Sequence, residues 1–127
     1  MAKGKIGVFD SGFGGLSILK EIVKKLPRYD YVYLGDTART PYGNRSQKEI
    51  FKFTKEGIDF LFSKRAGLVI LACNSASSGA LRKIQQEYLT GKRAGKKVLG
   101  VIVPAVEEAV LRTKNNRIAV IGTKATI

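Results

Sequence analysis

The sequence contains no histidine, no tryptophan and one cysteine, Cys73, among its 127 residues. Histidine is the commonest general base and metal ligand in proteins, so a histidine-based catalytic triad and a Cys/His zinc site are excluded within this chain. A single cysteine cannot form an internal disulfide, and this fits a reducing cytoplasm. Any chemistry of this chain must therefore use carboxylates, hydroxyls, backbone amides and one thiol, and we expect no metal site.

Acidic residues are also scarce. The chain has 10 Asp and Glu against 23 Lys and Arg, which gives a formal net charge of +13 and a pI near 10.1. Such a charge raises nucleic acid as a partner. The basic residues, however, are spread from Lys3 to Lys124, and no aromatic-rich RNA-binding signature accompanies them. We therefore expect no nucleic-acid partner; the basic loop 90–97 is where that expectation is best tested.

Long hydrophobic runs are missing too. The longest apolar stretch, 67–73, spans about seven residues, which suits a strand but not a membrane span. The apolar run near the start, Ile6–Phe9, is too short for the core of a signal peptide. We expect a cytoplasmic protein with no membrane contact. With 44% hydrophobic and 26% charged residues, the chain has the composition of a globular domain.

Short apolar runs alternate with amphipathic segments along the chain. Five continuous runs predict strands that are buried on both faces: 6–9, 31–34, 68–71, 98–101 and 118–121. Helical spacing of apolar residues predicts four helices between them, around 16–26, 50–62, 78–89 and 103–111. This order indicates an α/β fold with a doubly wound, mostly parallel sheet.

The end of the chain differs from a finished domain. Residues 122–127 look like a turn in which Thr123 caps a helix that does not continue. We therefore expect residues 1–121 to form one α/β lobe and 122–127 to begin a segment that leads to a second, missing lobe. The sequence is predicted to be a fragment of a longer protein.

Three consecutive predicted strands end in loops of unusual composition: 10–15, 35–43 and 73–79. Ligands of open parallel sheets bind beyond the carboxyl ends of the strands, so these loops should meet at one rim. The first, Asp10-Ser11-Gly12-Phe13-Gly14-Gly15, is a glycine-rich turn whose amides could hold an anion. Its spacing matches neither a P-loop nor a dinucleotide-binding fingerprint. Asp10 has a simpler alternative role as a helix-capping carboxylate.

The second and third loops add further candidates. Tyr42 and Gly43 could offer a phenol and a backbone amide to a carboxylate, although a solvated Asp36–Arg39 pair is the simpler interpretation of that loop. Cys73 lies where a strand meets the start of a helix, whose positive end favours a thiolate; the alternative is a buried cysteine that acts as a small hydrophobe. Without histidine, a thiolate that moves protons is a better interpretation than one that attacks carbonyls.

At this point the motifs resemble a known family. Gly7-Val8-Phe9-Asp10-Ser11-Gly12 with Gly14-Gly15-Leu16, Gly35-Asp36-Thr37-Ala38-Arg39 with Pro41-Tyr42-Gly43, Ala72-Cys73-Asn74-Ser75-Ala76-Ser77, and Val120-Ile121-Gly122-Thr123 with Ala125-Thr126-Ile127 follow in order. Together they closely resemble the N-terminal half of cofactor-independent glutamate racemases. The resemblance covers essentially the whole chain and implies one lobe of a two-lobed racemase fold.

The resemblance implies a two-base racemisation of glutamate without pyridoxal phosphate or another cofactor. Cys73 matches one of the two cysteine bases and Asp10 the acidic residue that assists it. The substrate-binding positions of the family match Asp10, Ser11, Tyr42, Gly43, Asn74 and Ser75. The product, D-glutamate, implies a role in peptidoglycan synthesis and hence in cell wall and cell shape. The positive charge of the chain could help to attract a dianionic substrate.

Some family features are missing. Ser75 stands where the family usually has threonine, and the second cysteine, its neighbouring histidine and the second lobe are absent. We therefore expect this chain alone to have little or no racemase activity. Alternatives are another cofactor-independent racemase, such as one for aspartate or hydantoins, a maleate isomerase, or a half-domain with a regulatory or nucleic-acid-binding role. The resemblance further implies homodimerisation of complete family members.

Overall fold

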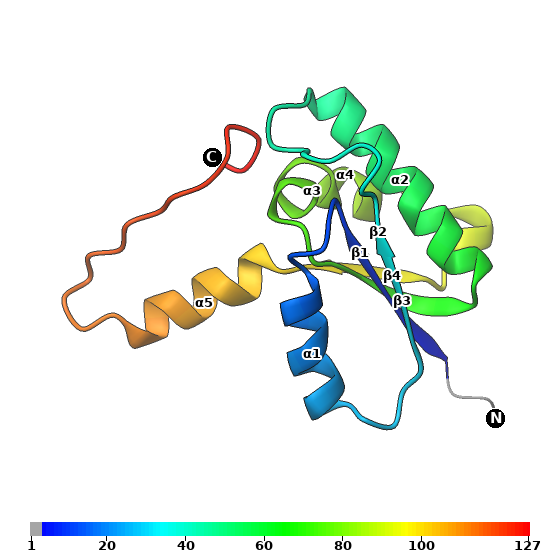
Figure 1. Ribbon diagram of the computed structural model, residues 1–127, viewed down its shortest axis with the longest axis horizontal. Helices are drawn as coiled ribbons and strands as arrows, with labels where there is room; N and C mark the ends of the chain where they lie inside the picture. Colours follow the sequence, from blue (N-terminus) through cyan, green and yellow to red (C-terminus); the bar gives the residue numbers. More distant parts are fainter. Residues whose placement is uncertain (1–3) are drawn as a thin grey trace.

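Four parallel strands form the centre of the molecule, whose computed structural model describes residues 4–127. In space the strands follow the order β2-β1-β3-β4 (Figure 1). Their bounds are Lys5–Asp10 for β1, Tyr31–Gly35 for β2, Ala66–Leu71 for β3 and Lys97–Gly100 for β4. The predicted α/β class and parallel sheet are thus confirmed, and four of the five expected strands are present.

Helices connect and cover these strands. They are α1 (Leu16–Lys25), α2 (Gln47–Ser63), α3 (Asn74–Gly79), α4 (Leu81–Lys83), the π-helical turn η1 (Ile84–Tyr88), the 3-10 turn η2 (Gly91–Arg93) and α5 (Ile102–Arg112). The four predicted helical regions are confirmed, although the third is divided into α3, α4 and η1. Helix α2 begins at a capping box, in which Ser46 and Glu49 bond each other's backbone amides.

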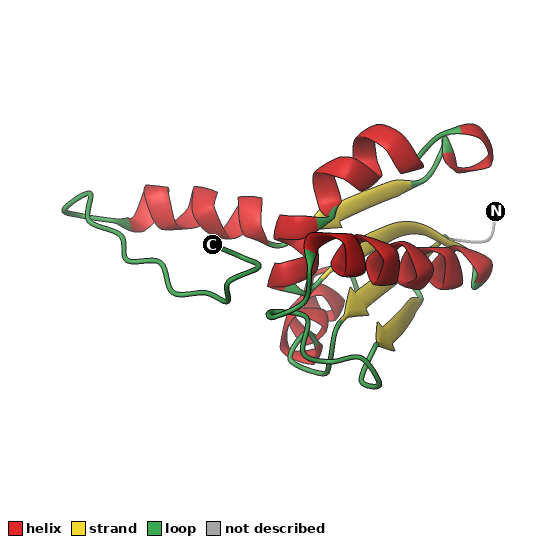
Figure 2. Cartoon of the chain, turned by 90° about the horizontal axis from the view of Figure 1, so that it is seen from above, coloured by secondary structure: helices red, strands yellow, loops and turns green. Residues whose placement is uncertain are grey.

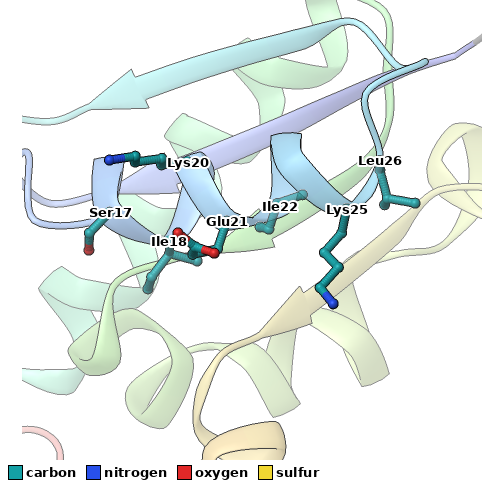
Figure 3. Close-up of a pocket in the computed structure, with 7 residues that line it drawn as sticks. All are labelled: Ser17, Ile18, Lys20, Glu21, Ile22, Lys25 and Leu26. Atoms are coloured by element: carbon teal, nitrogen blue, oxygen red, sulfur yellow. The ribbon is translucent and has the colours of Figure 1, made fainter.

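The sheet has a core on each face. On one face, α2 and α3 cover the larger core, which contains Phe9, Val69 and Val98. On the other face, Ile18 and Leu19 of α1 pack on a smaller core around Val8. This helix also borders a surface hollow (Figure 3). The hollow is lined by Ser17, Ile18, Lys20, Glu21, Ile22, Lys25 and Leu26.

The prediction of a fifth strand at 118–121 is wrong. Helix α5 carries the chain away from the sheet, and the extended segment after it returns alongside this helix (Figures 1 and 2). In the described part of the chain the segment pairs with no strand, and Val120 and Ile121 are 73% and 97% exposed. Its apolar run has the composition of a strand, but a strand needs a neighbour to satisfy its backbone groups.

The last residues fold back onto the body of the molecule. Ala125 is buried in the larger core, and its amide donates to the carbonyl of Gly43 at 3.3 Å. Residues 123–127 form the expected turn, closed by the amides of Thr126 and Ile127 on the Thr123 carbonyl, and no helix follows within the described residues. No helix within residues 4–127 is long and apolar enough to cross a membrane.

Packing between α2 and β1 leads to a stability prediction. A Cβ atom added at Gly57 would lie 2.5 Å from Cε2 of Phe9, whose ring is fully buried. Alanine in a helix is normally favoured over glycine by about 1 kcal/mol, whereas overpacking a core costs about 1–3 kcal/mol. We therefore expect Gly57→Ala to lower the free energy of unfolding by up to about 2 kcal/mol, measured by urea denaturation.

The matched control is Gly67→Ala in β3. A Cβ there meets no atom within 4 Å, so the free energy of unfolding should change by less than about 0.5 kcal/mol. Equal stability of the two variants would contradict the close packing of α2 on Phe9.

Candidate active site

The loops that follow β1, β2 and β3 meet at the carboxyl edge of the sheet, as the sequence predicts. They border one cavity of about 820 Å³, together with residues of α5 and the C-terminal segment. Every residue predicted for the site lines it: Asp10, Ser11, Tyr42, Gly43, Cys73, Asn74 and Ser75. The structure thus brings all of these residues together, while their chemical roles stay predictions.

Cys73 occupies the N-cap position of α3, directly after β3. Its Sγ accepts a hydrogen bond from the amide of Ala76 at 3.4 Å and lies 3.4 Å from Oγ of Ser11. The residue is 6% exposed, so the side chain is also buried, as the alternative interpretation of Cys73 requires. A merely space-filling cysteine needs neither an amide nor a hydroxyl beside its sulfur. Both groups are able to stabilise a negatively charged sulfur.

Asp10 caps the turn that leads into α1. Its Oδ2 accepts hydrogen bonds from the amide of Gly15 at 2.6 Å and from the Tyr33 phenol at 2.9 Å, and the residue is 5% exposed. Asp10 thus bonds the residue from which the helix begins and not an amide of its first turn, and the same carboxylate also lines the cavity. Burial, followed by the hydrogen bond and the charge of Asp10, raises the pKa of Tyr33 well above its ordinary value.

Tyr33 does not line the cavity but supports it through Asp10, and the sequence did not single it out. It belongs to the apolar run of β2, where an aromatic residue is expected for packing alone. Only the parallel pairing of β1 with β2 places its hydroxyl group beside Asp10 and within 3.1 Å of the Gly12 carbonyl.

The Tyr42 phenol lies in a network of charged side chains, whereas the sequence suggested that it contacts a carboxylate of a ligand. It donates to Asp36, which also accepts from Nε of Arg39 at 2.7 Å; Arg39 in turn pairs with Glu56 at 2.6 Å. The predicted Asp36–Arg39 pair is thus confirmed. Burial, followed by the Asp36 hydrogen bond, raises the pKa of Tyr42 and keeps the phenol protonated. Any contact of this loop with a ligand would come from the backbone at Tyr42 and Gly43.

The C-terminal segment adds hydroxyl groups that sequence reasoning missed. Thr123 and Thr126 line the cavity, and Oγ1 of Thr123 lies 3.2 Å from Oγ of Ser75. Thr123 packs so tightly on Gly43 that a Cβ there would come within 2.6 Å of its Cγ2. Glycine at position 43 is therefore required by this contact. The only signal in the sequence is two hydroxyl residues after an apolar run, and it does not reveal which loop they meet.

Comparison with known proteins gives a consistent result, although no family model matches. The chain is 49% identical over 123 residues to the glutamate racemase of Aquifex aeolicus, covering 97% of this chain and 46% of that protein. Its structure matches glutamate racemase from Aquifex pyrophilus with a TM-score of 0.87 at 46% identity, over 96% of this chain and 46% of that one.

A second solved structure is that of glutamate racemase from Francisella tularensis in complex with D-glutamate. It matches with a TM-score of 0.82 at 39% identity, over 99% of this chain and 45% of that one. The chain therefore spans slightly less than half the length of the proteins that it matches.

Proposed function

We propose that this chain, a homologue of about one half of glutamate racemase, supplies one base and part of the substrate-binding surface for a cofactor-independent racemisation of glutamate. One observation carries the proposal. Cys73, the one thiol of the chain, lies at the carboxyl edge of the sheet with an amide and a hydroxyl beside its sulfur, in the cavity that all the predicted site residues line.

In the proposed reaction, the Cys73 thiolate takes the α-proton of glutamate and becomes a thiol. The electron pair of the broken C–H bond stays on the substrate, in a carbanion-like state that electrostatic contacts must stabilise. Ser11, Asn74 and Ser75 would hold the carboxylates and the ammonium group through hydroxyl and amide groups, with the backbone at Tyr42 and Gly43. Asp10 would assist Cys73 from the adjoining loop. Because the bound substrate is held in one orientation, the proton leaves from one face only.

The proposal concerns one side of a two-sided reaction. Inversion requires a proton donor on the face opposite Cys73, and this sequence contains no second cysteine and no histidine. We propose that residues 1–121 correspond to one lobe and that residues 122–127 lead toward a second lobe with the other base. The exposed apolar side chains of α5, Val103, Val106 and Val110, support this proposal, because such side chains are normally covered by further protein.

The test is proton exchange in deuterated water, followed by NMR of the α-hydrogen and by optical rotation. The Cys73 thiol exchanges its proton with solvent and returns deuterium to the same face, so this chain should deuterate one enantiomer of glutamate with retention of configuration. Loss of optical rotation at the rate of deuteration would contradict the one-base proposal. Absence of exchange with either enantiomer would contradict the role of Cys73.

Substrate choice is tested in the same way. Aspartate and hydantoins are the alternatives for a cofactor-independent racemase, and exchange of either one faster than glutamate would favour that alternative. If glutamate is preferred, we propose that the complete protein supplies D-glutamate for peptidoglycan in the cytoplasm.

A further inference from the structure

The basic residues that are dispersed along the sequence gather at one edge of the fold. Because all four strands are parallel, the connections that lead into them lie together at the amino edge of the sheet, opposite α3 and the C-terminal segment (Figure 1). These connections and the adjoining ends of the helices and strands carry Lys5, Lys24, Lys25, Arg28, Lys64, Arg65, Lys92, Arg93, Lys96 and Lys97. The carboxylates of the same region are fewer: Asp30 lies in a connection, and Glu21, Asp59 and Glu87 lie near the ends of the helices.

The carboxyl edge, where the candidate active site lies, has a different charge balance. Its loops carry two carboxylates, Asp10 and Asp36, and two arginines, Arg39 and Arg45, both of which form salt bridges. The C-terminal segment at this edge adds one exposed cation, Lys124. The third loop, 73–79, carries no charged side chain. The net charge of +13 is therefore not concentrated around the site, so attraction of substrate does not account for it.

Most cations of the amino edge have no carboxylate to neutralise them. Within the described chain, Lys24 and Arg93 pair with Glu21 and Asp59. Six others are exposed and have no salt bridge among residues 4–127: Lys25, Arg28, Lys64, Arg65, Lys92 and Lys97. Arg65 adopts a φ of 70°, a left-handed conformation that favours glycine. An arginine therefore occupies a position where the backbone alone would favour glycine.

The order of the strands arranges these cations in a row. Lys25 and Arg28 precede β2, Lys64 and Arg65 precede β3, and Lys92 and Lys97 lie at the entry to β4. Neighbouring strands are about 4.8 Å apart, so the row extends over roughly 15 Å of the sheet edge. A linear array of unpaired cations matches a linear polyanion.

Contrary to the expectation from the sequence, we propose that this amino edge binds the phosphate backbone of single-stranded nucleic acid, independently of the proposed racemase site on the opposite edge. Tyr29 lies in the same row, after Arg28, and is 43% exposed. An exposed ring beside cations suits stacking by an unpaired base. A helix that inserts into an anionic membrane presents a broad apolar face, whereas the exposed apolar side chains of the connection before β2 are limited to Leu26 and Tyr29.

The experiment measures fluorescence anisotropy of a labelled single-stranded RNA of about 20 nucleotides, at several salt concentrations. Neutralising four cations with Arg28→Gln, Lys64→Gln, Lys92→Gln and Lys97→Gln should weaken binding at least about tenfold at physiological salt. A plot of the logarithm of the association constant against the logarithm of the salt concentration should also become less steep, with a slope smaller in magnitude by about 3. The control combines Lys48→Gln, Lys52→Gln, Arg82→Gln and Lys114→Gln, which remove the same charge from exposed positions away from the edge.

A loss confined to the edge variant supports the proposal. Equal losses of affinity in both variants would show that net charge alone drives binding and would overturn the proposal. Absence of RNA binding by the unmodified chain would overturn it as well. Tighter binding to vesicles rich in phosphatidylserine than to RNA would overturn it in favour of a membrane. Thermal unfolding of each variant confirms that it is folded, and the glutamate exchange assay reads the racemase proposal separately.

Discussion

Replacing Cys73 with serine should lower the rate of glutamate α-proton exchange by about 10³-fold, the range that a positioned general base contributes. A serine hydroxyl is almost entirely protonated at neutral pH and cannot take the proton. The substitution nevertheless retains a polar atom that can accept from the Ala76 amide, as Sγ does now at 3.4 Å. The free energy of unfolding should therefore change by no more than about 1 kcal/mol. NMR of glutamate in deuterated water measures the exchange rate, and urea denaturation measures stability.

Two controls accompany this variant. Ser63→Ala removes an exposed hydroxyl that bonds the Phe60 carbonyl at the far end of α2, and it should leave exchange unchanged. Alkylation by iodoacetamide should modify Cys73 faster than an equally buried thiol that has no amide or hydroxyl beside its sulfur, and it should abolish exchange in proportion, while glutamate should slow the modification. Wild-type exchange by Cys73→Ser would show that another group is the base.

The sequence is sufficient to predict the parts of the fold that depend on local patterns. Continuous apolar runs predict strands that are buried on both faces, and β1 to β4 confirm that these runs form strands. Burial on both faces holds for β1, whereas β2 is half-buried and Leu99 of β4 is 50% exposed. The position of the site follows from the same reasoning, because loops that follow parallel strands share one edge. One cavity is lined by Asp10, Gly43 and Cys73, although Asp10 and Cys73 are 63 positions apart in the sequence.

The features that depend on partners could not be predicted in this way. Residues 118–121 have the composition of a strand, but composition does not tell whether a neighbouring strand is present. The hydrogen bonds of Tyr33 and Tyr42 could not be predicted for the same reason. Tyr33 bonds Asp10 and the Tyr42 phenol bonds Asp36, and both contacts are set by how strands and loops meet in space. The gathering of cations at the amino edge also follows from topology, since lysines far apart in sequence precede adjacent strands.

Asp10 combines two roles that substitution can separate. Asp10→Ala removes the acceptor of the Gly15 amide, which is buried, and of the Tyr33 phenol, which is partly buried. Unpaired buried groups cost about 1–3 kcal/mol each, so we expect the free energy of unfolding to fall by about 2 kcal/mol or more. Asp10→Asn keeps a carbonyl oxygen that can accept both hydrogen bonds. It should therefore cost less than about 1 kcal/mol by urea denaturation.

The two variants differ in what they predict for chemistry. If Asp10 only caps the turn, the well-folded Asp10→Asn should exchange glutamate protons at the wild-type rate. If its charge also assists Cys73, as we propose, exchange should fall about 10²-fold while stability is retained. An ultraviolet titration provides an independent check on the charge. Asp10 raises the pKa of Tyr33 through its hydrogen bond and its charge, so Tyr33 should ionise at lower pH in Asp10→Asn, although burial still holds its pKa above the ordinary value. A lowered Tyr33 pKa together with an unchanged exchange rate would leave Asp10 a purely structural residue.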